Sequence, residues 1–180
     1  MTIKQAILGY LSWKPLSGYD LKKLFAESAA MHWSGNSNQI YRALVELHQE
    51  GLVVREVQSQ ENLPARKEYT ITPTGHDALR RWVQSTPDMP QLRNTFLVQL
   101  AWADLLTPAE LDDLLAQYEE EMRVQVLMLR EQAQRGHNAP ARTPREMALW
   151  RAIDENWISY YETQQTWAHA TRQNLSQADS

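Results

Sequence analysis

The amino-acid sequence predicts a mostly helical protein with one β-hairpin, divided into two domains. Apolar residues recur at helical spacing in the first fifty residues, and an alternating pattern replaces this spacing only between residues 52 and 72. Beyond residue 90 the helical spacing returns. We therefore expect a first domain at residues 1–86, a short linker at 87–90, and an antiparallel helical second domain within residues 87–180.

Three short helices are expected before the hairpin. The first covers about residues 2–13 and is closed by Pro15. The second ends near residue 29, and a capped third helix covers residues 37–50. Gly51 supplies the backbone conformation in which helices often end.

The hairpin is expected to have strands at residues 52–58 and 66–72 with a polar tip at 59–65. Thr72 and Pro73 then begin a fourth helix, because Thr is a favoured N-cap and Pro fits the first helical position. Helix, helix, helix, hairpin, helix is the element order of a winged helix-turn-helix.

The second domain is expected to contain helices only. One covers about residues 92–100, and two capping boxes at Thr107 and Thr143 begin two longer helices. The last of these reaches about residue 175.

Composition excludes several classes of protein. The chain has 180 residues and no cysteine, so it forms no disulfide, thiolate metal site or cysteine nucleophile. Its longest nearly apolar run is far below the roughly 20 residues that cross a bilayer. Its five histidines have no metal-site spacing, and no nucleotide-binding or hydrolase motif is present. We expect a cytoplasmic protein that is neither an enzyme nor dependent on a cofactor or metal.

Charge differs between the two halves. The formal net charge of −4 combines +2 for residues 1–86 with −6 for residues 87–180, and all five lysines lie in the first half. Because nucleic-acid binding depends on the charge of one domain and one face, this balance leaves double-stranded DNA open as a partner.

The third helix is the candidate recognition helix. Its first turns carry amide and guanidinium groups that match base edges, and basic residues of the second helix and the hairpin could contact phosphate. The alternative is a capped surface helix, with the charges simply solvated. The residues concerned are Ser37, Asn38, Gln39 and Arg42 on the third helix, Lys22 and Lys23 on the second, and Arg66 and Lys67 on the hairpin.

The last helix carries an aromatic heptad seam that either packs within the chain or forms a homodimer. We favour the dimer because a small domain can hardly cover so much indole alone. Other aromatic residues could line a cavity for a small aromatic effector between the halves, although core packing is the commoner role. The seam comprises Trp150, Ile153, Trp157, Tyr160 and Trp167, and the effector candidates are Tyr10, Phe96 and Trp102.

Four motifs in residues 3–86 carry a resemblance to a known family. They are Ile7-Leu8-Gly9-Tyr10-Leu11, Ser17-Gly18-Tyr19-Asp20-Leu21, Gln39-Ile40-Tyr41-Arg42-Ala43-Leu44 and Tyr69-Thr70-Ile71-Thr72-Pro73-Thr74-Gly75. With them, this part of the chain resembles the PadR family of bacterial transcriptional regulators. The hairpin departs from the family pattern, because members often have Gly-Arg-Pro where this chain has Asn62-Leu63-Pro64.

The resemblance implies a winged helix whose third helix enters the major groove of DNA. It adds Tyr41 to Asn38, Gln39 and Arg42 as DNA-contacting positions. It also implies a homodimer built through the C-terminal helices, and repression that a small effector such as a phenolic acid relieves. Two alternatives stay open: a dimeric winged-helix module that binds a protein partner without DNA, and a ligand-binding or enzymatic helical domain with an accessory first module.

Overall fold

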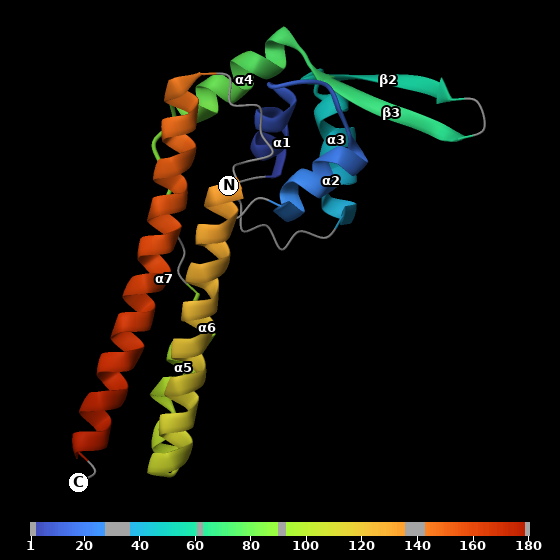
Figure 1. Cartoon of the computed structure of the whole chain (residues 1–180). Helices are drawn as coiled ribbons and strands as arrows, with labels where there is room; N and C mark the ends of the chain where they lie inside the picture. The colour runs from blue at the N-terminus through green and yellow to red at the C-terminus, as the bar shows by residue number, and fades with distance from the viewer. Residues whose placement is uncertain (1–2, 28–36, 61–62, 90–92, 136–142, 179–180) are drawn as a thin grey trace. The chain divides into compact units, whose positions relative to one another are not determined.

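The structure is a computed structural model that describes residues 3–27, 37–60, 63–89, 93–135 and 143–178 (Figure 1). The chain divides into two compact units. The N-terminal unit spans Met1–Met89, and the C-terminal unit contains Pro90–His137 and Ala141–Ser180. The predicted fold class, mostly α with one β-hairpin, is confirmed.

The N-terminal unit has the element order of a winged helix-turn-helix. Its small antiparallel sheet has the strand order β1-β3-β2, in which the two-residue β1 was not predicted. The elements are α1 (Ile3–Leu11), β1 (Leu16–Ser17), α2 (Gly18–Glu27), α3 (Ser37–Gln49), β2 (Val53–Gln60), β3 (Leu63–Ile71) and α4 (Pro73–Val83).

One hydrophobic core joins the helices of the N-terminal unit to the sheet. The apolar side of α3 lies in this core, as its helical spacing predicted, and Ile40, Leu44 and Leu47 are each at most 2% exposed. Ile7 of α1 and Val53 of β2 are buried in the same cluster. Burial of one side of α3 fixes its opposite side toward solvent.

The turn after α3 connects three elements of this unit. Gly51 adopts a left-handed φ of 71°, and the Leu52 amide donates to the Leu47 carbonyl. The Thr72 hydroxyl donates to the Gly51 carbonyl and accepts from the Gly75 amide at 3.0 Å, so one side chain caps α4 and holds the turn. A Cβ at Gly75 would lie 2.2 Å from the Leu52 carbonyl oxygen, so only glycine allows this approach.

The hairpin is longer than predicted, and the expected polar tip at residues 59–65 is wrong. Strand β2 continues to Gln60, which pairs with Leu63, with a register shift between Gln58 and Gln60. Pro64 therefore lies within β3. Proline is tolerated there because β1 pairs with β3 only at Glu68 and Tyr69, which leaves this end of β3 with one neighbouring strand.

The C-terminal unit is an antiparallel pair of long helices with a short helix beside them (Figure 1). The Thr107 capping box is formed, with the Glu110 carboxylate accepting from the Thr107 amide at 2.8 Å. No helix among the described residues is long and apolar enough to cross a membrane. The elements are α5 (Thr95–Ala101), the 3₁₀ turn η2 (Ala103–Leu105), α6 (Pro108–Arg135) and α7 (Pro144–Ala178).

Contacts along the α6–α7 pair combine apolar packing with ion pairs. Leu115 of α6 and Ala168 of α7 are almost completely buried. Arg172 makes a bidentate pair with Asp112 at 2.5 and 2.8 Å, and this bond lowers the pKa of the Asp112 carboxyl. The ion pair joins the beginning of α6 to the end of α7, in keeping with their antiparallel arrangement.

Candidate functional site

The predicted recognition residues lie on the solvent side of α3. Asn38, Gln39, Tyr41 and Arg42 are all exposed, and the Arg42 side chain is 84% exposed. Ser37 begins the helix, but its side chain lies outside the described part of the chain. Polar and aromatic groups therefore occupy the first two turns of α3, opposite its buried side.

Tyr41 is positioned by a glycine of the preceding helix. A Cβ built on Gly18 would lie 2.4 Å from Cε1 of Tyr41, so the ring rests against the backbone at the start of α2. About half of Tyr41 remains exposed beyond this contact. The role of Gly18 was missed from the sequence, where the only signal was a glycine in the first turn of a helix.

A chain of ion pairs links α3 to α1. The Arg42 Nε donates to Glu46 Oε1 at 3.1 Å, while Lys4 Nζ lies 2.9 Å from Glu46 Oε2 and 2.7 Å from Glu50 Oε1. The hydrogen bond from Lys4, and then that from Arg42, lowers the pKa of the Glu46 carboxyl. The bond to Glu50, and then that to Glu46, raises the pKa of Lys4. Neither Lys4 nor Glu46 was among the residues predicted for this site from the sequence.

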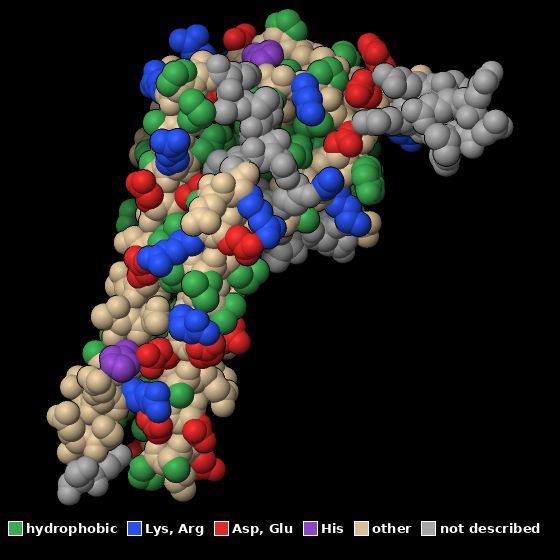
Figure 2. Space-filling model, in the orientation of Figure 1, with side chains coloured by type: hydrophobic (Ala, Val, Ile, Leu, Met, Phe, Trp, Pro, Cys, Tyr) green, Lys and Arg blue, Asp and Glu red, His purple; other side chains and the backbone are tan. Residues whose placement is uncertain are grey.

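The remaining basic candidates lie on α2 and on the hairpin. Lys22 and Lys23 are exposed on α2, and Lys67 is exposed on β3, where it pairs with Val57 of β2. Arg66 belongs to β3, but its side chain is outside the described residues. In Figure 2, Lys and Arg side chains on the visible surface are interspersed with acidic ones and do not form a single continuous patch.

The three predicted effector residues are not gathered in one unit. Tyr10 is 3% exposed in the N-terminal core, where its ring centroid lies 5.1 Å from that of Trp13 and 5.2 Å from that of Phe25. Phe96 and Trp102 belong to the C-terminal unit, and they differ in burial, at 7% and 71% exposed. Core packing therefore accounts for the place of Tyr10.

An aromatic and amide cluster joins the three helices of the C-terminal unit. The Phe96 ring stacks on Tyr118 of α6 at 3.8 Å, and Trp167 of α7 meets both rings edge-on. Asn94 caps α5 through its side-chain oxygen and donates its amide to the Tyr118 hydroxyl at 3.0 Å. That hydroxyl donates to Gln164 at 3.1 Å. We call these five residues the Tyr118 cluster.

The predicted dimer seam on α7 changes character along the helix. Trp167 packs within the chain as part of the Tyr118 cluster, and Trp157 lies beside Tyr160 on the same helix. Trp150 is half-buried and Ile153 is 37% exposed. Whether these residues also contact a second copy stays a prediction.

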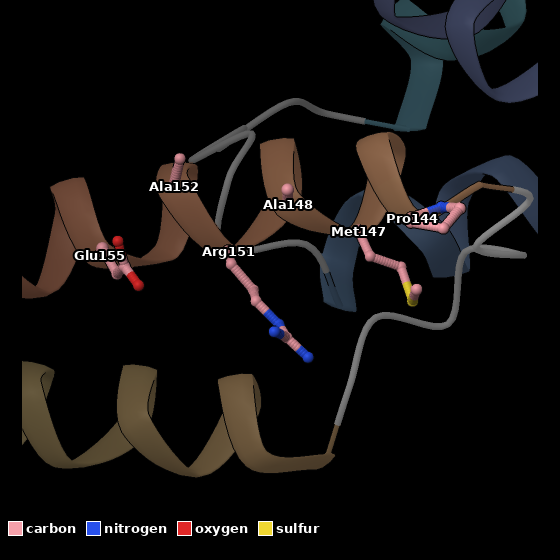
Figure 3. Close-up of a pocket in the computed structure, with 6 residues that line it drawn as sticks. All are labelled: Pro144, Met147, Ala148, Arg151, Ala152 and Glu155. Carbon is pink, nitrogen blue, oxygen red and sulfur yellow. The ribbon is translucent and has the colours of Figure 1, made fainter.

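A shallow groove runs along the first turns of α7, close to the exposed part of the seam (Figure 3). In Figure 3, the Met147 and Arg151 side chains extend from the same side of the helix. Among the described residues, no group of three potential ligands could hold a metal ion. The groove is lined by Pro144, Met147, Ala148, Arg151, Ala152 and Glu155.

These features define a winged-helix protein whose third helix has an exposed polar side, with a second, helical unit. Residues 7–81 match the transcriptional regulator PadR-like family, and residues 92–176 match the virulence activator alpha C-terminal family. The chain therefore contains a PadR-like family domain followed by a virulence activator alpha C-terminal domain, and members of the PadR-like family are transcriptional regulators and not enzymes.

Two curated relatives share about a third of the aligned residues. The chain is 32% identical over 113 residues to the negative transcriptional regulator PadR of Bacillus subtilis, covering 62% of each protein. It is 32% identical over 83 residues to a probable transcriptional regulator of Mycobacterium tuberculosis, covering 46% of this chain and 44% of that protein. The matches thus span less than two thirds of either relative.

Solved structures have the same fold over nearly the whole chain. Bacillus subtilis PadR in complex with operator DNA gives a TM-score of 0.83 at 22% identity and covers 96% of this chain and 98% of that one. The same protein in complex with p-coumaric acid gives 0.79 at 22%, covering 97% and 98%. The Vibrio cholerae virulence activator AphA gives 0.71 at 24%, covering 98% and 99%.

We expect Tyr118→Phe to lower the free energy of unfolding by about 1 kcal/mol, because it removes the hydroxyl that bridges Asn94 and Gln164. Asn94→Ala removes a helix cap and should cost about as much. The double variant should lose less than the sum, since both changes break the same bond. Urea denaturation measures all three. Tyr160→Phe is the matched control, because the Tyr160 hydroxyl makes no hydrogen bond to any described residue. If the losses of the Tyr118 and Asn94 variants added up exactly in the double variant, the two residues would not be coupled.

Proposed function

We propose that this protein is a sequence-specific DNA-binding transcriptional regulator in which α3 enters the major groove. One observation carries the proposal: Asn38, Gln39, Tyr41 and Arg42 are exposed together on the side of α3 that faces away from the core. Amide and guanidinium groups are those that recognise adenine and guanine edges in the major groove. Support also comes from the shared fold of Bacillus subtilis PadR, which has been solved with operator DNA.

The other basic residues have a different role in this proposal. Lys22 and Lys23 precede the recognition helix, and Arg66 and Lys67 belong to the hairpin, where they would contact the DNA backbone. Phosphate contacts fix the position of a protein on DNA but read no sequence. The net charge of −6 for residues 87–180 makes that half a poor partner for DNA, so the contacts are assigned to the N-terminal unit.

Selection from a pool of random duplexes at two salt concentrations tests this function. We expect enrichment of an inverted repeat with half-sites about one helical turn apart. Arg42→Ala should weaken binding to the selected site by about 1–3 kcal/mol, whereas Lys67→Ala should mainly reduce the salt dependence by about one released counterion.

Three results would separate the alternatives for this interface. Equal losses for Arg42→Ala on selected and scrambled DNA would contradict base reading. Binding without enrichment would contradict sequence specificity. Affinity for duplex DNA that does not change with salt would instead favour a module that binds a protein partner, because phosphate contacts always release counterions.

We propose that the regulator acts as a homodimer, which places two copies of α3 on a pseudo-palindromic operator. The C-terminal unit supports this with exposed apolar side chains on two elements. Leu105 is 86% exposed after α5, and Leu149 and Ile153 are 58% and 37% exposed on α7. Leu149 and Ile153 are neighbours one turn apart on α7, and adjacent exposed apolar side chains are what an interface would bury.

Ile153→Asp should shift the protein from dimer to monomer at micromolar concentration, because it would place a carboxylate in the proposed apolar interface. Ser159→Asp is the matched control, since it adds the same charge at an exposed position of the same helix that faces away from Ile153. Light scattering after size-exclusion chromatography measures the mass, and circular dichroism checks the helix content. A wild-type monomer would contradict the dimer, and a dimeric Ile153→Asp variant would exclude this face.

We propose that DNA binding represses transcription and that a small aromatic acid relieves it. Bacillus subtilis PadR is a negative regulator and has been solved with p-coumaric acid. In this chain, the Tyr118 cluster and the exposed Trp102 supply aromatic surface in one unit. Release requires the ligand to prefer the unbound state, and a complete switch needs roughly 5.5 kcal/mol of differential affinity.

We expect p-coumaric acid to release the selected operator and to change tryptophan fluorescence in the same concentration range. Trp102→Ala should weaken both effects if Trp102 contacts the ligand. A fatty acid of similar length serves as the control, because it carries the carboxylate without the ring. Retention of the operator at saturating p-coumaric acid, with fluorescence unchanged, would contradict an aromatic acid of this kind as the effector.

A further inference from the structure

Arg42 does not project freely into solvent, although its side chain is 84% exposed. Its Nε is bound to Glu46 one turn further along α3, at 3.1 Å. This geometry uses Nε and leaves the two terminal nitrogens of the guanidinium to make a bidentate pair with a guanine edge. Glu46 therefore restricts the orientation of Arg42 without occupying the atoms that would recognise a base.

Glu46 is itself held from α1. Its second carboxylate oxygen lies 2.9 Å from Lys4 Nζ, and Lys4 also pairs with Glu50 at 2.7 Å. The side chains of Lys4 and Glu46 are 27% and 36% exposed, far less than that of Arg42. The carboxylate is thus anchored on the body of the domain, while the guanidinium is the exposed end of the chain of charges.

A carboxylate at this position weakens two kinds of DNA contact to different extents. It repels phosphate, so a purely electrostatic contact by Arg42 must overcome both the repulsion and the existing ion pair. A guanine edge offers two acceptors to the terminal nitrogens, and Arg42 can make this contact while keeping Glu46. The carboxylate therefore weakens contacts without sequence information more than contacts with it.

We propose that Glu46 is a specificity-determining positioning residue: it holds Arg42 in an orientation suited to base recognition, and Lys4 on α1 holds Glu46. This inference rests on the proposed function, because it concerns how the recognition helix distinguishes sequences. By this inference, Lys4 also contributes to DNA specificity, although it lies on α1 and not on the recognition helix.

The test compares variants on the selected operator and on scrambled DNA. Glu46→Gln keeps the size of the side chain and removes its charge, so it should tighten binding to scrambled DNA and reduce the specificity ratio by about two- to fivefold, as expected for an exposed ion pair. Lys4→Met should reduce the ratio by a smaller factor, because Glu46 loses its anchor. Glu50→Gln is the matched control. It removes the charge of the second carboxylate bound to Lys4, and because Glu50 is not paired with Arg42, the specificity ratio should stay unchanged.

A structural role is separated from a positioning role by repeating the change without Arg42. In the Arg42→Ala background, Glu46→Gln should no longer alter the specificity ratio if Glu46 acts through Arg42. If Glu46→Gln changed the specificity ratio equally without Arg42, the proposal would be overturned, because Glu46 would then act through its charge alone. Thermal denaturation of each variant shows whether the domain remains folded at the binding temperature.

A measurement without DNA checks the anchor directly. Titration of the Glu46 carboxyl by NMR should give a pKa below its ordinary value in the wild type and a higher one in Lys4→Met. An unchanged pKa would contradict the anchoring of Glu46 by Lys4. If the wild type selects no operator, the proposed function fails; if it does and Glu46→Gln keeps the full specificity ratio, only this inference fails.

Discussion

Burial of the apolar side of α3 is the constraint on which the candidate DNA interface depends. Ile40, Leu44 and Leu47 lie at i, i+4 and i+7 and are almost completely buried, so the helix cannot rotate about its axis without exposing them. Loss of a buried Leu or Ile typically costs about 2–5 kcal/mol, far more than any of the exposed polar contacts contributes. The core therefore sets the side of α3 from which Asn38 and Arg42 project, and the ion pair with Glu46 then restricts the Arg42 guanidinium on that side.

The fold class was predictable because it depends on periodicity and on a few turn residues. The burial of the α3 stripe, the glycine ending at Gly51 and the cap at Thr72 all follow from local rules that apply within a few residues. The length of the hairpin was not predictable in the same way. A proline usually ends a strand. Pro64 is acceptable within β3 because β1 is short and leaves that end of β3 with a neighbouring strand on one side only.

The candidate site was predictable only in part, because its finer contacts join residues distant in sequence. Periodicity placed Arg42 on the outer face of α3 and the family resemblance added Tyr41, and both residues are exposed there. It could not show that Gly18 supports the Tyr41 ring or that Lys4 reaches Glu46, since both contacts depend on how α1 and α2 pack on α3. Likewise, aromatic spacing on α7 indicated a seam but left open whether its residues pack within the chain, as Trp167 does.

The C-terminal unit shows why apolar spacing alone gives an ambiguous prediction of assembly. Phe96 of α5 is buried against Tyr118, whereas Val98 on the same helix is 60% exposed and Trp102 just beyond it is 71% exposed. Apolar side chains thus lie on two sides of this short segment, and α6 and α7 cover only one of these sides within the described chain. The Tyr118 cluster fixes which side of α5 faces inward, and so it also determines which side stays exposed.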